Sequence, residues 1–221
     1  MTFNPRLNPY VSKLEEYRDI IKTLPIDSNT DFYDFIRLPN RLILDLGCGA
    51  GNFLRDYASI VKQANFIGFE LRYKRLVKGA VKLKKRNLIN VKLIQARAED
   101  IDLWFANRKV DEIYINFPDP WPKKRHHKHR LMSAVFLNKV RKILNEENGF
   151  LVFKTDHKEY FESVVALLQQ QMDDFEIVEM SDDLHKSEFK DKNIFTEFES
   201  LFKHKGFPVY YLKTKLQLSN D

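Results

Sequence analysis

A carboxylate, an indole and a dense group of cations stand together between residues 116 and 130. This stretch reads Asn-Phe-Pro-Asp-Pro-Trp-Pro-Lys-Lys-Arg-His-His-Lys-His-Arg. Asp119 has little backbone freedom because Pro118 and Pro120 restrict the chain on either side of it. Trp121 offers a flat ring for stacking, and the cations that follow attract phosphate groups. These residue types predict a site that holds a nucleobase together with its phosphate backbone.

A glycine-rich turn comes earlier in the chain, between an apolar segment and a predicted helix. It reads Asp45-Leu46-Gly47-Cys48-Gly49-Ala50-Gly51. Glycine is needed where φ is positive or where the backbone approaches a ligand closely. A dinucleotide fingerprint requires G-x-G-x-x-G, and Asn52 stands at its last position. The tighter spacing favours S-adenosylmethionine, whose cationic sulfur and ammonium group suit Asp45. Glu70 ends the next apolar segment, where a carboxylate accepts hydrogen bonds from ribose hydroxyls.

A second group of cations occupies one face of the helix predicted over residues 72–87. Its members recur at every fourth position: Lys74, Lys78, Lys82 and Arg86. Like charges at this spacing destabilise a helix by roughly 0.2–0.5 kcal/mol per pair, so a phosphate-rich partner gives a physical reason for them. His126, His127 and His129 lack the spacing of a zinc site, and we predict no metal.

The composition narrows the remaining possibilities. The chain has 221 residues, 43% of them hydrophobic, and a formal net charge of +6. Cys48 is the single cysteine, so no internal disulfide forms and a reducing compartment fits. The first residues lack the apolar core of a signal peptide, and no run approaches the ~18 apolar residues of a membrane span. We expect a cytoplasmic protein, monomeric or homodimeric, without membrane contact or an obligate protein partner.

The motifs need a scaffold that brings them to one edge. Strand patterns cover residues 42–46, 65–70, 91–94, 112–116, 149–154, 175–178 and 209–213. Helical patterns cover residues 51–63, 72–87, 131–145, 157–171 and 194–204, with a short helix within 11–23. Strands that alternate with helices predict an α/β fold with a doubly wound, mostly parallel, seven-stranded sheet. Such sheets bind ligands beyond the carboxyl ends of their strands, where every motif above falls. Residues 1–40 are expected to form a short N-terminal extension.

Several motifs occur in an order that resembles one enzyme family. They are the glycine turn from Asp45 to Gly51, Gly68-Phe69-Glu70, the block from Asn116 to His126, Thr155-Asp156, and Thr196-x-Phe198-Glu199. The set resembles the bacterial tRNA (guanine-N7)-methyltransferases and covers roughly residues 41–213. The resemblance implies a class I methyltransferase domain over residues 41–221. Its methyl donor would be S-adenosylmethionine, and its substrate would be the variable-loop guanine of tRNA.

The resemblance and the chemistry of the motifs together assign roles to individual residues. The expected donor site comprises Asp45, Gly47, Gly49, Gly51, Glu70, Ala98, Glu99, Asn116 and Asp119. The expected substrate contacts are Lys123, Lys124, Arg125, Asp156, Thr196 and Glu199. The expected catalytic group is Asp119, Asp156 and Glu199, which would stabilise a cationic product. Arg97 stands where the family usually has Asp, so Ala98 or Glu99 is expected to contact the adenine.

Other interpretations of these residues stay open at this point. The nearest is an S-adenosylmethionine-dependent enzyme that acts on an exocyclic base amine or on another RNA. A catalytically silent RNA-binding module would bind tRNA without using the donor, and an NAD-linked oxidoreductase is the most distant option. Asp156 also fits a plain helix N-cap.

Overall fold

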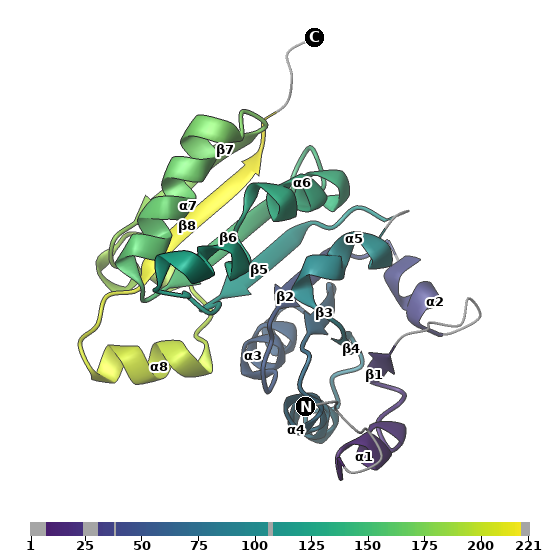
Figure 1. Ribbon diagram of the computed structural model, residues 1–221. Coiled ribbons are helices and arrows are strands. Elements are labelled where there is room, and N and C mark those ends of the chain that lie inside the picture. Colours follow the sequence, from purple (N-terminus) through teal and green to yellow (C-terminus); the bar gives the residue numbers. More distant parts are fainter. Residues whose placement is uncertain (1–7, 24–30, 38, 106–107, 218–221) are drawn as a thin grey trace. The chain divides into compact units, whose positions relative to one another are not determined.

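The computed structural model describes residues 8–23, 31–37, 39–105 and 108–217 (Figure 1). The chain consists of two compact units, residues 1–98 and 99–221. The described residues form an α/β fold with eight strands, four in each unit, and most paired strands are parallel. The predicted fold class is thereby confirmed. No helix in these ranges is long and apolar enough to cross a lipid bilayer.

The first unit is built on a fully parallel sheet. Its strands lie in the order β1 (Ile21–Thr23), β4 (Val91–Gln95), β3 (Asn65–Phe69) and β2 (Leu42–Leu46). Its helices are α1 (Val11–Glu15), α2 (Asp31–Arg37), α3 (Asn52–Ile60) and α4 (Tyr73–Lys85). Every residue of β2 and β3 is buried. Burial of this kind is typical of parallel strands that are covered on both faces.

The strand β1 departs from the sequence prediction. We expected a helix within residues 11–23 and seven strands, whereas α1 ends at Glu15 and the chain then pairs in parallel with β4 as an eighth strand. Ile20 and Ile21 are 7% and 4% exposed, so burying them drives this pairing. A strand of three residues is too short for its period to show in the sequence. The rest of the predicted extension is described only over residues 8–23, 31–37 and 39–40.

The second unit contains a mixed sheet. Its strands lie in the order β5 (Glu112–Asn116), β6 (Phe150–Thr155), β8 (Tyr210–Leu216) and β7 (Phe175–Ser181), with β8 antiparallel to both of its neighbours. Its α-helices are α5 (Ile101–Trp104), α6 (Ala134–Ile143), α7 (Lys158–Gln171) and α8 (Glu197–His204). Short 3-10 helices are η2 (Ala98–Asp100), η3 (Lys124–His129), η4 (Leu184–Lys186) and η5 (Lys190–Lys192). In Figure 1, α7 packs across β6, β7 and β8.

The strand ends carry most of the predicted site residues. In the first unit, β2 leads into the glycine turn and β3 leads into Glu70. In the second unit, β5 leads into the Asp119 loop and β6 leads into Asp156. Both strand pairs are parallel. Within each unit, the two carboxyl ends therefore lie side by side, as they do at the ligand-binding edge of open α/β sheets.

Candidate active site

The glycine turn after β2 is bonded to the end of β3. The backbone N–H groups of Gly47 and Cys48 both donate to the carbonyl of Phe69, at 2.9 and 2.8 Å. Gly47, Gly49 and Gly51 have φ values of 82°, 57° and 68°, a region that L side chains rarely adopt. The spacing of these glycines therefore has a direct backbone reason, and the turn lies next to Glu70.

Two buried carboxylates flank this turn. Asp45 is 2% exposed and Glu70 is 9% exposed, and Glu70 Oε1 accepts a hydrogen bond of 2.8 Å from the Arg72 backbone N–H. Burial raises the pKa of the Cys48 thiol well above its usual value, and Asp45 and Glu70 raise it further. A neutral, buried thiol is a poor nucleophile, so Cys48 packs in the turn and is not a reactive group.

These features fit S-adenosylmethionine. The donor set offers two carboxylates to a ligand that carries an ammonium group, a sulfonium and two ribose hydroxyls. The glycine backbone leaves room for a ligand to approach closely, since a Cβ at Gly47 would meet nothing within 4 Å. When bound, this group would supply an electrophilic methyl group.

The cationic face of α4 is divided between two tasks. Lys82 Nζ donates to the Ala50 carbonyl at 3.1 Å and to Asn52 Oδ1 at 2.6 Å, so this lysine supports the glycine turn. Lys74, Lys78 and Arg86 are exposed. Phosphate binding by this face stays a prediction, and Lys82 is the member whose ammonium group is used inside the protein.

The loop after β5 presents Asp119 on a constrained backbone. Phe117 and Trp121 on either side of it have positive φ values, 51° and 43°. Such conformations cost about 1–3 kcal/mol in non-glycine residues and concentrate at functional sites. Asp119 is exposed, and its carboxylate makes no hydrogen bond or ion pair within the described residues. Its acceptor oxygens are therefore available to a ligand.

The buried guanidinium of Arg130 holds this loop in place through hydrogen bonds. The sequence groups it with the phosphate-binding cations, but it is only 7% exposed. Its Nε donates to the Pro120 carbonyl at 2.8 Å and its Nη1 donates to Ser163 Oγ at 3.1 Å. Its guanidinium also lies 4.8 Å from the ring centroid of Tyr160, where burial raises the pKa of the phenol to about 12. The guanidinium of Arg130 therefore makes its contacts within the protein and supports the loop.

The remaining basic run coils into η3. Lys123, Lys124, Arg125 and Lys128 are exposed. Trp121 is 37% exposed and packs against two histidines of this helix, with ring centroids 5.8 Å from His126 and 5.3 Å from His129. The indole is thus held beside the cations with part of its face open to solvent, an arrangement suited to base stacking next to phosphate contacts.

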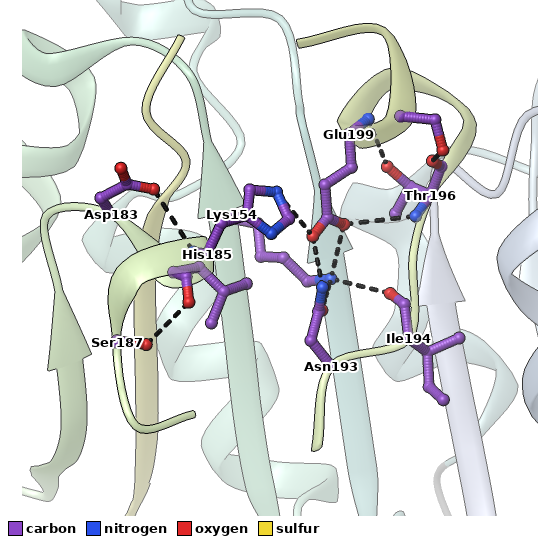
Figure 2. A network of polar contacts seen from close by, with 10 residues as sticks. Lys154, Asp183, His185, Ser187, Asn193, Ile194, Thr196 and Glu199 are labelled. Carbon is purple, nitrogen blue, oxygen red and sulfur yellow. Dashed lines mark hydrogen bonds and ion pairs between the residues drawn. The ribbon is translucent and has the colours of Figure 1, made fainter. Parts of the chain in front are cut away.

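Glu199 lies in a buried polar network, which Figure 2 shows. It is fully buried, and its Oε2 faces Lys154 Nζ at 3.1 Å and accepts from the Thr196 backbone N–H at 3.2 Å. Its Oε1 accepts from the Asn193 side chain and lies 3.6 Å from His185 Nε2. Oε2 therefore accepts from two donors and Oε1 from one, so most of the acceptor capacity of this carboxylate is already used inside the protein.

Helix α8 is joined to the Asp119 loop through aromatic packing. The ring of Phe117 lies 5.5 Å from that of Phe202 and 6.3 Å from that of Phe198, measured between centroids. Thr196 directly precedes this helix and Glu199 lies in its first turn, where the Thr196 Oγ1 accepts from the Glu199 N–H at 3.0 Å. The structure thus brings the Thr196-x-Phe198-Glu199 motif and the Asp119 loop together within the second unit.

The remaining predicted site residues lie at strand ends or at the boundary between the two units. Asp156 is exposed, and the N-cap of α7 is His157, whose Nδ1 accepts from the Tyr160 N–H at 3.2 Å. The capping alternative for Asp156 is therefore wrong. Asn116 is half-buried at the end of β5. Ala98 closes the first unit and Glu99 opens the second, where the Glu99 carbonyl accepts from Lys139 Nζ at 2.6 Å.

Sequence reasoning missed Lys154 and His185. A lysine inside the apolar strand Phe-Leu-Val-Phe-Lys-Thr is the one signal that could have revealed a buried ionic partner, because a lysine is almost never fully buried unless it is paired. His185 carries no such signal. Its role depends on the stacking of its ring against Phe195, at 5.2 Å between centroids, and on its proximity to Glu199.

Comparison with known proteins agrees with this geometry. Residues 39–212 match the family described as putative methyltransferase. The chain is 37% identical over 201 residues to a bifunctional glycosyltransferase/methyltransferase of Fusobacterium nucleatum subsp. nucleatum. That match covers 90% of this chain but 31% of the relative, so the chain spans about a third of that protein's length.

Solved structures share the fold at low identity. An antibiotic-related methyltransferase matches with a TM-score of 0.66 and 19% identity, over 89% of this chain and 97% of that one. The 16S rRNA methyltransferase KamB matches with a TM-score of 0.64 and 13% identity, over 87% and 95%. A putative methyltransferase from Streptococcus mutans in complex with SAH matches with a TM-score of 0.53 and 15% identity, over 84% and 95%. The family match over residues 39–212, together with the fold, shows that this chain belongs to the family of putative methyltransferases.

Proposed function

We propose that this protein transfers the methyl group of S-adenosylmethionine to N7 of the variable-loop guanine of tRNA. The observation that carries the proposal is the Asp119 loop. It holds an unpaired, exposed carboxylate on a strained backbone, beside a partly exposed indole and a run of exposed cations. A carboxylate recognises guanine through its N1–H and 2-amino donors, and cations recognise the attached phosphates. Among the solved structures that share this fold, KamB is a 16S rRNA methyltransferase and another is an rRNA methylase from Streptococcus thermophilus.

Methyl transfer to guanine N7 requires the protein to align the two reactants and to stabilise a developing positive charge. Guanine N7 carries a lone pair and no proton, so no general base is required. Holding two reactants in line contributes up to about 7–11 kcal/mol in favourable cases. The methylated purine is cationic, and carboxylates placed beforehand stabilise the charge that develops. We assign this task to Asp119 and Asp156, which follow adjacent parallel strands and are both exposed.

Glu199 differs from Asp119 and Asp156 because its carboxylate oxygens already have hydrogen-bond partners inside the protein. Its oxygens are occupied by Lys154, Asn193 and the Thr196 backbone. We propose that Glu199 orients Thr196 toward the substrate and contacts guanine only by exchanging its bond with Asn193. Lys123, Lys124 and Arg125 are assigned to the tRNA backbone, and Asp45, Glu70 and the glycine turn to the donor.

Transfer of label from methyl-labelled S-adenosylmethionine to bulk unmodified tRNA tests the proposal. Nucleoside analysis should find the label in 7-methylguanosine, and borohydride followed by aniline should cleave the RNA at the variable loop. If the label were found in another nucleoside, the protein would be a methyltransferase of a different base. Binding of tRNA without any transfer would favour the silent RNA-binding module.

The variant Asp119→Ala tests the role of the loop. We expect methyl transfer to fall by about 10²-fold or more, because a charge-stabilising group is removed from the reacting base. Binding of tRNA and the unfolding midpoint should change little, since Asp119 is exposed and unpaired. Asp173→Ala, at an exposed position in the turn that follows α7, is the matched control. Transfer near the normal rate in Asp119→Ala would overturn the catalytic assignment.

A further inference from the structure

One face of α4 lies along the glycine turn. Arg75, Gly79 and Lys82 share this face because they are four and then three residues apart. A Cβ at Gly79 would lie 3.6 Å from the Ala50 carbonyl oxygen, so the helix and the turn are in close contact there. Lys82 hydrogen-bonds the same Ala50 carbonyl at 3.1 Å. This contact fixes the position of Arg75 at the other end of the face.

Arg75 is placed at the turn without a partner of its own. Its Nη1 would lie 2.9 Å from a Cβ at Gly49, so the guanidinium occupies the space that a side chain there would take. Arg75 is half-buried, and its side chain makes no hydrogen bond or ion pair within the described residues. Its positive charge reaches the Cys48 thiol, where it opposes the rise in pKa that burial causes. A guanidinium carries five N–H donors, and at this position they remain available.

The charges around the turn complement the donor. Asp45 and Glu70 place two buried carboxylates beside it, and Arg75 adds one cation. S-adenosylmethionine has the opposite set: a sulfonium, an ammonium group and one carboxylate. Asp45 and Glu70 carry the same charge as that carboxylate and repel it. A planar guanidinium, in contrast, binds carboxylates through two parallel hydrogen bonds.

We propose that Arg75 binds the carboxylate of the methionyl part of S-adenosylmethionine and so selects donors that retain this group. This inference rests on the donor assigned under the proposed function and is independent of which RNA is methylated. Arg75 acts in binding, and its side chain takes no part in methyl transfer.

Calorimetric titration of the whole chain with two ligands tests this. One ligand is S-adenosylmethionine and the other is its decarboxylated form, which keeps the sulfonium, the amine and the adenosine. Arg75→Ala should weaken binding of S-adenosylmethionine by about ten- to a hundredfold, each tenfold being about 1.4 kcal/mol. The same variant should bind the decarboxylated ligand as the unmodified protein does. Arg75→Lys should lie between the two.

Lys85→Ala is the matched control, because Lys85 is an exposed cation on the same helix and has no assigned role. It should leave both affinities unchanged, and all variants should keep the normal melting temperature. An equal loss for both ligands in Arg75→Ala would overturn the proposal, because it would mean that Arg75 supports the turn rather than the carboxylate. No loss for either ligand would overturn it too. If the unmodified protein bound neither ligand, the donor assignment itself would fail.

Discussion

The glycine turn of the first unit and the Glu199 network of the second unit both position buried carboxylates, but they do so with different forces. Asp45 and Glu70 are set by the backbone: parallel strands, positive φ values and two N–H bonds to the Phe69 carbonyl. Glu199 is set by side chains, above all by Lys154 at 3.1 Å, which is 2% exposed. A site built from the backbone is rigid without its ligand. A site built from buried charges depends on every partner, because removing one leaves the other uncompensated.

The largest effect that separates the two regions is expected for Lys154→Met. This change leaves the fully buried Glu199 carboxylate without its cation, while Met fills most of the space. Breaking a buried ion pair from one side costs about 3–5 kcal/mol of the free energy of unfolding. Urea denaturation measures it, with the unmodified chain as reference.

A double variant sharpens the interpretation. In Lys154→Met/Glu199→Leu both charges are replaced by apolar side chains of similar size. Such replacements are often neutral for stability, so most of the lost free energy of unfolding should return. A double variant as unstable as Lys154→Met would show that the ion pair is not the source of the cost. Methyl transfer should stay low in the double variant, since Glu199 is absent.

A smaller effect is expected in the glycine turn. Gly49→Ala and Gly47→Ala both place a Cβ at positive φ, which costs about 1–2 kcal/mol. The Cβ at Gly47 meets nothing within 4 Å, whereas the one at Gly49 meets Arg75. Both variants should lose similar stability in urea, but Gly49→Ala should lose more affinity for S-adenosylmethionine. Equal affinities in the two variants would argue against a role for the space that Arg75 occupies.

The smallest effect concerns a partly exposed acid that belongs to neither of the two regions, Glu179 on β7. Burial pushes the pKa of Glu179 upward, but hydrogen bonds from Tyr211 at 2.6 Å and Lys213 at 3.2 Å outweigh it, so the pKa lies below its usual value. A lowered pKa in the folded state contributes stability above the unfolded pKa, and this contribution is lost as the pH falls through the folded value.

Solvent screening limits the contribution of Glu179 to under about 1 kcal/mol. Unfolding free energies of the unmodified chain and of Glu179→Gln, compared between about pH 6 and pH 3, measure it. The variant should lose less stability on acidification. An equal loss in both would assign the pH dependence to other carboxylates.

The order of the elements could be predicted because their signals are local. Strands β2, β3 and β6 are mostly apolar segments, and the glycine turn and Glu70 directly follow two of them. Every residue of β2 and β3 is buried, so their apolar character and the turn residues that follow were enough to locate them. The strand β1 escaped prediction because its three residues gain stability only from pairing with β4.

The sequence by itself determined which residues could do chemistry and at which strand ends they lie, because those properties follow from neighbours within a few positions. Only the tertiary structure decided how they are used. Lys154 and Glu199 are 45 residues apart in the chain, and Arg130 and Ser163 are 33 apart. Whether a cation is an internal anchor, as Arg130 is, or an exposed one, as Lys123 is, depends on burial. Burial is set by contacts between distant segments, which no local pattern encodes.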